Sequence, residues 1–228
     1  MSTLVPHRFL VRLAHACPYV AKMPVTKGGG FQLGLPDGAN LNHVAELDER
    51  ELFATISLGW NEFGLGVRLV VTGKKAKPAV DPVKPKSSDG LTLWIDTRDS
   101  RSSHRANRFC HQFFLLPCGG GEDETEPIFT FAKINRAQQD FTAPNPTDVR
   151  ITSEIGRTGY TVEAFLPTGC LTGYDPEQFP RLGISTLVND AELGRQYLGV
   201  NGDFPVDDDP SLWEVLELVK EKASSGSR

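Results

Sequence analysis

Polar and aromatic side chains that could bind a ligand alternate with apolar ones between residues 89 and 98. Thr92, Trp94 and Asp96 share one side of this stretch, and the period of two is that of a β-strand. A ring beside a carboxylate offers a sugar an apolar surface and a partner for its hydroxyls. We therefore predict that Trp94 is a stacking platform, the alternative being that a loop or neighbouring strand covers it. The opposite, core-facing side holds Leu91, Leu93 and Ile95.

Three further residues near this strand could supply hydrogen bonds. Asp96 and Arg98 lie at its end, and Gln112 lies in the next predicted strand, 108–117. Asp96 could instead form a structural ion pair with Arg98 or Arg108. His104 belongs to the polar loop 99–107, which is too long for a tight hairpin and is a candidate rim of a site.

Arg68 completes the candidate ligand-binding set. Residues 52–71 predict a hairpin that turns at Asn61 and Glu62, with an apolar face on its second strand that includes Phe63. Gly64, Gly66 and Arg68 line the other face. Glycine inside a strand indicates either close approach of a ligand or a bulky neighbour that covers it, and both alternatives stay open.

Metal and catalytic sites are less well supported by residue spacing. Cys110 and His111 are adjacent on a strand, so they point to opposite faces and cannot readily share an ion. The acidic turn 118–126 lacks the ligand spacing of an EF-hand. Glu163 with Asp96 could form the acid and base of a glycosidase, but an outward glutamate on a sheet is usually just solvated. We predict no metal ligands and no catalytic residues.

Composition bounds the class of protein. The 228 residues are 39% hydrophobic and 23% charged, with a net charge of −5, which is typical of a globular protein. Without a Lys/Arg stripe, an acidic chain is a poor binder of nucleic acid. No leader segment and no membrane-length apolar run is evident, and the four cysteines are scattered, so we expect a cytoplasmic protein with reduced thiols. The oligomeric state stays open.

About ten short strands with regularly spaced turns predict an all-β fold, an antiparallel β-sandwich with at most one or two short helices. No linker divides the chain, so we expect one domain over residues 1–221 and a disordered tail over 222–228. The lysine-rich segment 74–88 is expected to be a solvated loop. The last element, 212–219, fits both helical and strand periods.

The order of several motifs resembles that of family 9 carbohydrate-binding modules and of the wider DOMON-like sandwiches. The motifs are Leu58–Leu65, Ser88–Arg98, Gly159–Pro167, Leu182–Ile184 and Asn189–Asp190, and the match covers about residues 50 to 215. The resemblance implies a jelly-roll-like sandwich that binds sugars between aromatic side chains, sometimes with calcium holding a loop; other DOMON-like members hold haem. The matched positions are Trp60, Trp94, Asp96 and Glu163.

These observations favour a non-catalytic module that binds a glycan or another polyhydroxylated ligand. One alternative is a protein-interaction or scaffold sandwich without a small-molecule site. The other is a haem- or metal-binding DOMON-like protein, with His104 and His111 as candidate axial ligands of haem. No cofactor is expected apart from the calcium that the resemblance allows.

Overall fold

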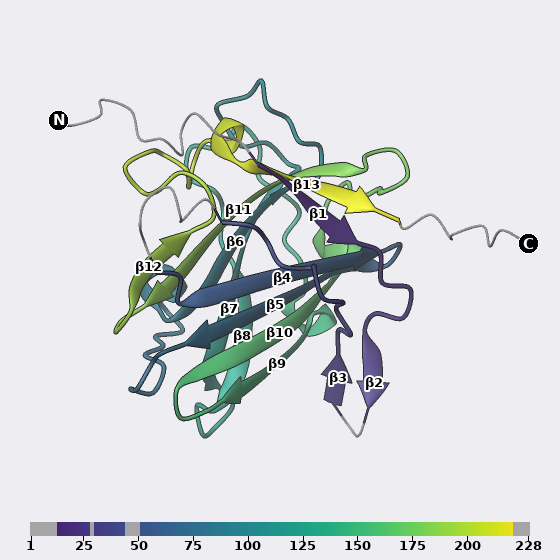
Figure 1. Ribbon diagram of the computed structural model, residues 1–228. Helices are drawn as coiled ribbons and strands as arrows, with labels where there is room; N and C mark the ends of the chain where they lie inside the picture. Colours follow the sequence, from purple (N-terminus) through teal and green to yellow (C-terminus); the bar gives the residue numbers. More distant parts are fainter. Residues whose placement is uncertain (1–12, 28–29, 44–50, 221–228) are drawn as a thin grey trace, which may run out of the picture.

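The regular structure is almost entirely β-strand, arranged in two facing sheets (Figure 1). The computed structural model describes residues 13–27, 30–43 and 51–220. Within them the helical elements are three-residue 3-10 turns, at Pro85–Ser87, Pro146–Asp148, Thr168–Cys170 and Pro210–Leu212. The predicted all-β sandwich is confirmed. No helix of the described part is long and apolar enough to cross a membrane.

The larger sheet forms one layer of the sandwich. Its strands, in spatial order, are β1 (Ala14–Pro18), β13 (Glu214–Val219), β11 (Arg181–Asp190), β6 (Gly90–Asp96), β7 (Cys110–Gly120) and β8 (Glu126–Phe131), with β12 (Gly194–Tyr197) beside β11. All neighbours are antiparallel except β1 and β13, which run parallel.

The smaller sheet forms the second layer. Its order is β4 (Ala54–Asn61), β5 (Gly64–Thr72), β10 (Gly159–Pro167) and β9 (Arg150–Ile155). A short hairpin of β2 (Val25–Lys27) and β3 (Gly30–Gln32) lies apart from both sheets in the strand pairing.

The main core lies between the two sheets, and strand alternation decides which residues enter it. The predicted core face of β6 is confirmed, since Leu91, Leu93 and Ile95 all belong to this core and are at most 1% exposed. On β7 the alternation also holds: Phe113 enters the main core, while Cys110 joins a second apolar cluster on the other side of the sheet.

The predicted hairpin is β4 and β5, and its glycines are explained by covering groups. A Cβ added to Gly66 would lie 2.3 Å from the Met23 sulfur, and one added to Gly64 would lie 2.1 Å from a backbone oxygen. The predicted place of Phe63 on the apolar face of the second strand is wrong. Phe63 lies in the turn before β5 and is 69% exposed.

The ambiguous C-terminal element is a strand, so its helical alternative is wrong. Residues 214–219 pair with β1 on one side and with β11 on the other. Leu216 and Leu218 enter the main core, whereas Val215 points the other way and is also buried. The segment is a strand because neighbouring strands bind its backbone on both sides, and both of its faces carry buried apolar residues. The predicted tail, 222–228, lies outside the described residues.

Candidate functional site

Trp94 is buried, so the exposed stacking platform predicted there is wrong. Its side chain points away from the main core, as expected, but it is 0% exposed. Loops that follow β8 and β12 bring Ile134 and Val206 over this face, and Trp213 joins the same apolar cluster. The alternation in the sequence identified the face correctly, but not the loops that cover it.

Asp96 and Arg98 stabilise loops and do not form the ion pair that was considered for them. The buried Asp96 carboxylate accepts hydrogen bonds from the backbone N–H groups of Arg98 and Ser100, at 2.9 and 2.6 Å. Burial raises the pKa of Asp96, and these two backbone bonds oppose the rise. The carboxylate therefore holds the turn after β6 in place.

The Arg98 side chain lies against two phenylalanine rings. Its guanidinium carbon is 4.6 Å from the Phe109 ring centroid and 3.7 Å from that of Phe179, within the range of cation–π attraction. The same group donates to the backbone oxygens of Gly173 and Thr97. Arg98 therefore ties the loop after residue 171 to the end of β6.

His104 is exposed and held by the segment before β13. Its Nδ1 lies 3.0 Å from a carboxylate oxygen of Asp209 and 3.0 Å from the Ser211 hydroxyl. His111, in contrast, is buried on the face of β7 that packs against the main core. Its Nε2 accepts a hydrogen bond from the Thr172 N–H at 2.9 Å. Burial lowers the pKa of His111 to about 4, so this ring is a neutral structural acceptor.

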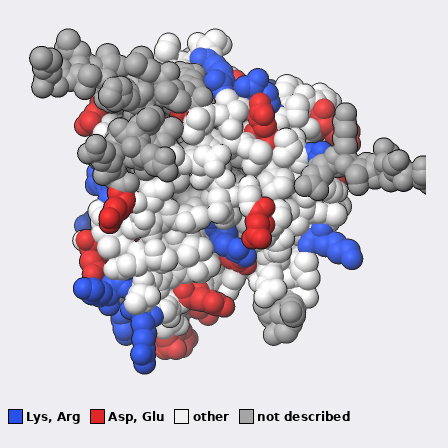
Figure 2. Space-filling model, in the orientation of Figure 1, with Lys and Arg blue, Asp and Glu red and all other residues white. Residues whose placement is uncertain are grey.

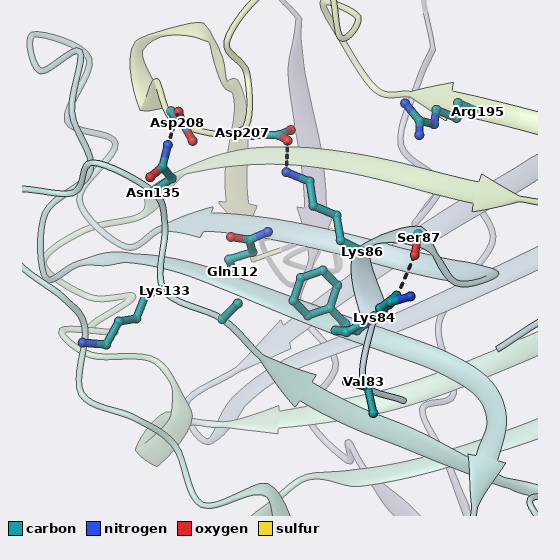
Figure 3. Close-up of a pocket in the computed structure, with 13 residues that line it drawn as sticks. Val83, Lys84, Lys86, Ser87, Gln112, Lys133, Asn135, Arg195, Asp207 and Asp208 are labelled. Atoms are coloured by element: carbon teal, nitrogen blue, oxygen red, sulfur yellow. Dashed lines mark hydrogen bonds and ion pairs between the residues drawn. The ribbon is translucent and has the colours of Figure 1, made fainter. Parts of the chain in front are cut away.

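Gln112 is the one member of the predicted set on this sheet that faces a hollow. The hollow, called here the Gln112 depression, measures about 580 Å³. Figure 3 shows the Gln112 amide between Lys86 and Asn135. Gln112 is only 5% exposed, and its side-chain amide makes no hydrogen bond with any residue that the structure describes. Phe114 and Ala132 add apolar surface to the lining.

The rim of the Gln112 depression carries charged and amide groups. Lys86 pairs with Asp207, and the Asn135 amide donates to Asp208 at 3.1 Å, as the dashed lines of Figure 3 mark. Lys84, Lys133 and Arg195 also line it, so four basic side chains stand against two acidic ones. The rim can therefore donate and accept hydrogen bonds and is positively charged on balance.

A second unpaired polar group lies beside Gln112. Trp94 is directly opposite Gln112 in the register of β6 and β7, and its buried indole N–H also has no hydrogen-bond partner among the described residues. Buried polar groups usually have partners. The Trp94 N–H is enclosed by the loops that cover its face, so of the two groups only the Gln112 amide can meet water or a ligand in the depression.

Arg68 lies on the opposite side of the molecule, on the smaller sheet. Its Nε donates to Glu163 Oε1 at 2.6 Å, and the two residues are directly opposite each other on β5 and β10. The structure thus does not bring Arg68 together with Gln112. It also separates Glu163 from Asp96, because these carboxylates lie on the outer faces of different sheets, so the glycosidase pair considered from sequence is not formed.

The residues that the structure describes give no support to the calcium that the resemblance allows. Among the described residues, no three His, Cys, Asp or Glu side chains gather where they could hold a metal ion. The acidic turn 118–126 joins β7 to β8 and stays without such a cluster.

Comparison with known proteins settles the fold. No family model and no curated protein matches the sequence. Solved structures do match, among them a family 9 carbohydrate-binding module from Caldicellulosiruptor kristjanssonii in complex with cellotriose, and one from the same organism in complex with glucose. The first is 14% identical, with a TM-score of 0.58 over 95% of this chain and 98% of its own. The second is 15% identical, with a TM-score of 0.59 over 94% and 100%.

This chain has the fold of a family 9 carbohydrate-binding module. The similarity extends over nearly the whole chain and includes the N-terminal strand, which the motif match from residue 50 onward did not reach. Identities this low establish the family 9 fold alone.

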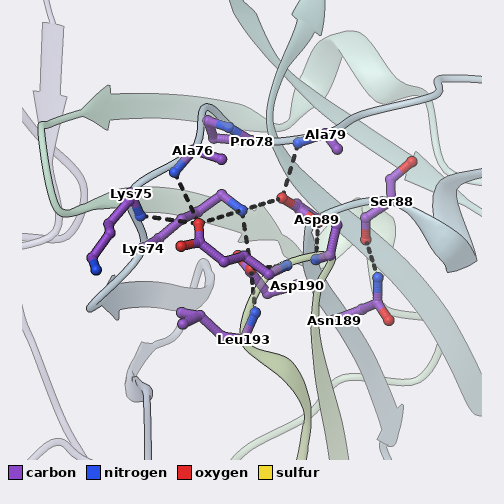
Figure 4. Close-up of polar contacts among 12 residues, drawn as sticks. Lys74, Lys75, Ala76, Pro78, Ala79, Ser88, Asp89, Asn189, Asp190 and Leu193 are labelled. Carbon is purple, nitrogen blue, oxygen red and sulfur yellow. Dashed lines mark hydrogen bonds and ion pairs between the residues drawn. The ribbon is translucent and has the colours of Figure 1, made fainter.

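A buried ion cluster was missed in the sequence, where residues 74–88 were predicted to be a solvated loop. Lys74 is 2% exposed and lies 3.0 Å from both Asp89 and Asp190 (Figure 4). Burial by itself lowers the pKa of Lys74, but its hydrogen bonds to the two carboxylates outweigh this and raise it. The ammonium therefore stays charged and joins the end of β5 to β6 and β11. Only Asp89 and Asp190, both within matched motifs, hinted at this role.

Proposed function

We propose that this chain is a non-catalytic module that binds a glycan or another polyhydroxylated ligand, and that the Gln112 depression is its binding site. The Gln112 amide, which faces the hollow without a hydrogen-bond partner among the described residues, carries the proposal. Its donor and acceptor are free for a ligand, and because the side chain is largely buried, a ligand that bonds to it also replaces hydration lost on folding.

The chemistry of the Gln112 depression matches that of a sugar. A sugar hydroxyl both donates and accepts hydrogen bonds, and an amide offers both functions in one group. Asn135 and Asp208 add a further donor and acceptor at the rim, and Phe114 and Ala132 supply apolar surface for the C–H face of a ring.

The fold gives independent support to this proposal. The two similar structures were solved with cellotriose and with glucose. The absence of catalysis is supported by the carboxylates themselves: Asp96 and Glu163 lie on different sheets, while Asp207 and Asp208 at the rim are engaged by Lys86 and Asn135.

A glycan array followed by calorimetry tests the proposal. Neutral and acidic oligosaccharides are screened, and the best ligand is titrated into the wild type, Gln112→Leu and Gln178→Leu. Gln178 is exposed and is not among the residues that line the depression, so it is the matched control. We expect Gln112→Leu to weaken binding at least tenfold, about 1.4 kcal/mol, and the control to bind normally. Unchanged affinity in Gln112→Leu would contradict the depression as the binding site, because the glycan would then bind elsewhere. A wild type that binds nothing on the array would contradict glycan binding itself and favour a scaffold role.

A further inference from the structure

A second hollow lies on the outer face of the smaller sheet, on the other side of the sandwich from the Gln112 depression. This hollow, the Arg68 groove, measures about 630 Å³. Its floor includes Arg68 on β5 with Thr161 and Glu163 on β10, and its wall includes Phe31 of β3. Figure 2 shows this face, where basic and acidic side chains lie close together near the middle, with uncharged surface around them and further charged side chains toward the edges.

The groove lies beside a part of the sheet face that another chain segment covers. Leu35 and Met23 pack directly over Gly59 and Gly66, where an added Cβ would lie 2.6 and 2.3 Å from their side chains. Arg68 is the next residue after Gly66 on the same face of β5, and there the sheet opens to the hollow. The border between covered and open sheet is therefore a hollow with a rigid floor of paired strands.

The ion pair on the floor leaves hydrogen-bonding capacity unused. The Arg68 side chain is 34% exposed, and its Nε donates a hydrogen bond to Glu163. Neither its two terminal amino groups nor Glu163 Oε2 has a hydrogen bond with a described residue. Glu163 thus orients the guanidinium, and both partners still offer donors and an acceptor toward the groove, beside the hydroxyl of Thr161.

The wall supplies an aromatic surface of fixed position. Phe31 is partly buried and packs against an apolar cluster of Met23, Leu33 and Phe165. A partly exposed ring, a carboxylate and fixed donors around one hollow are the groups that recognise a sugar. With Glu154 also in the lining, one basic side chain stands against two acidic ones, which disfavours an anionic ligand.

We propose that the Arg68 groove is a second binding site, for a neutral sugar residue whose ring lies against Phe31 and whose hydroxyls bond to Arg68 and Glu163. It stands independently of the Gln112 depression, since packed sheets are about 10 Å apart and the two sites open to opposite sides. One molecule with both sites could hold two glycan chains at once, which raises avidity for a polymer.

Two-dimensional amide NMR of the full chain, titrated with glucose and with cellotriose, tests this site. In the wild type we expect the Arg68 and Thr161 amide signals to shift in a saturable way. Arg68→Met should weaken that response at least tenfold, and Arg157→Met, a change in the exposed turn between β9 and β10, should not. Thr161→Val serves as a second variant of similar volume, should Arg68→Met fail to fold, and should also weaken the response.

The same titration separates this proposal from the first. Saturable shifts of the groove signals support the second site whether or not the signals around Gln112 move, whereas shifts confined to signals around Gln112 support the depression and contradict the second site. Groove signals that stay still with both sugars, or that respond equally in the wild type and in Arg68→Met, overturn the second site.

Discussion

Replacing Gln112 by leucine should make the protein more stable while weakening its binding of ligand. The side chain is 5% exposed and its amide bonds to no described residue, so the amide meets water only through the depression and the folded state carries part of its desolvation cost. A fully buried amide costs about 1–3 kcal/mol in proteins, and the partial cost lies in the lower half of that range. Leucine has a similar size and loses less side-chain entropy on burial.

Some of this gain is offset because leucine cannot copy the shape of glutamine perfectly, which costs up to about 1 kcal/mol. We therefore expect the free energy of unfolding to rise by about 1 kcal/mol. In a domain of this size that raises Tm by about 2–4 °C.

Urea denaturation and calorimetry of ligand-free protein measure the effect, with Gln178→Leu as the exposed control, which should stay within about 0.5 kcal/mol of wild type. A loss of 1 kcal/mol or more in Gln112→Leu would refute the reasoning, because it would mean that the amide is satisfied in the free protein. Gln112 would then be a structural residue, and the depression would lose its main support as a site.

The remaining predictions concern buried charges. Lys74→Met should lower the free energy of unfolding by about 3–5 kcal/mol, because it leaves Asp89 and Asp190 buried without their cation. Lys75→Met, at the exposed neighbouring position, is the control. Equal stability of the two variants in urea denaturation would contradict the role given to the cluster. Stability should also fall in acid. Burial lowers the pKa of both His15 and His111 from 6.5 to about 4, so the unfolded chain binds more protons below pH 6.5. Stability is then full above that pH and is lost toward pH 4, by about 3 kcal/mol for each histidine. Urea unfolding between pH 4.5 and 7.5 measures the slope, and a flat profile would show that these rings are not buried as neutral groups.

Strand alternation predicted much of the fold because it depends on local chemistry. Leu91, Leu93 and Ile95 face the core as their spacing indicates, and the hairpin of β4 and β5 turns where Asn61 ends the first strand. The 212–219 segment could not be assigned from its spacing, since both periods fit. Its pairing with β1, some 200 residues away, decides its conformation.

The candidate site was less predictable because it depends on loops and on register. Alternation places Trp94 on an outer face but carries no information on the cover that Val206 and Trp213 provide. In the same way, nothing local to Arg68 identifies Glu163 as its partner, because the register of β5 against β10 sets that contact. Lys74 looked like one of several solvated lysines, and only the folded chain brings Asp190 to it.

The parallel pairing of β1 with β13 has a mechanical consequence. The strands lie side by side over five residue pairs, from Ala14 with Val215 to Pro18 with Val219, and chain attached before β1 leaves from the end opposite to chain attached after β13 (Figure 1). A pull on both attachments acts along the strands in opposite directions, so it loads the hydrogen bonds between them in shear, all together, instead of opening them one at a time. A load applied through the two ends of this strand pair therefore meets five residue pairs at once.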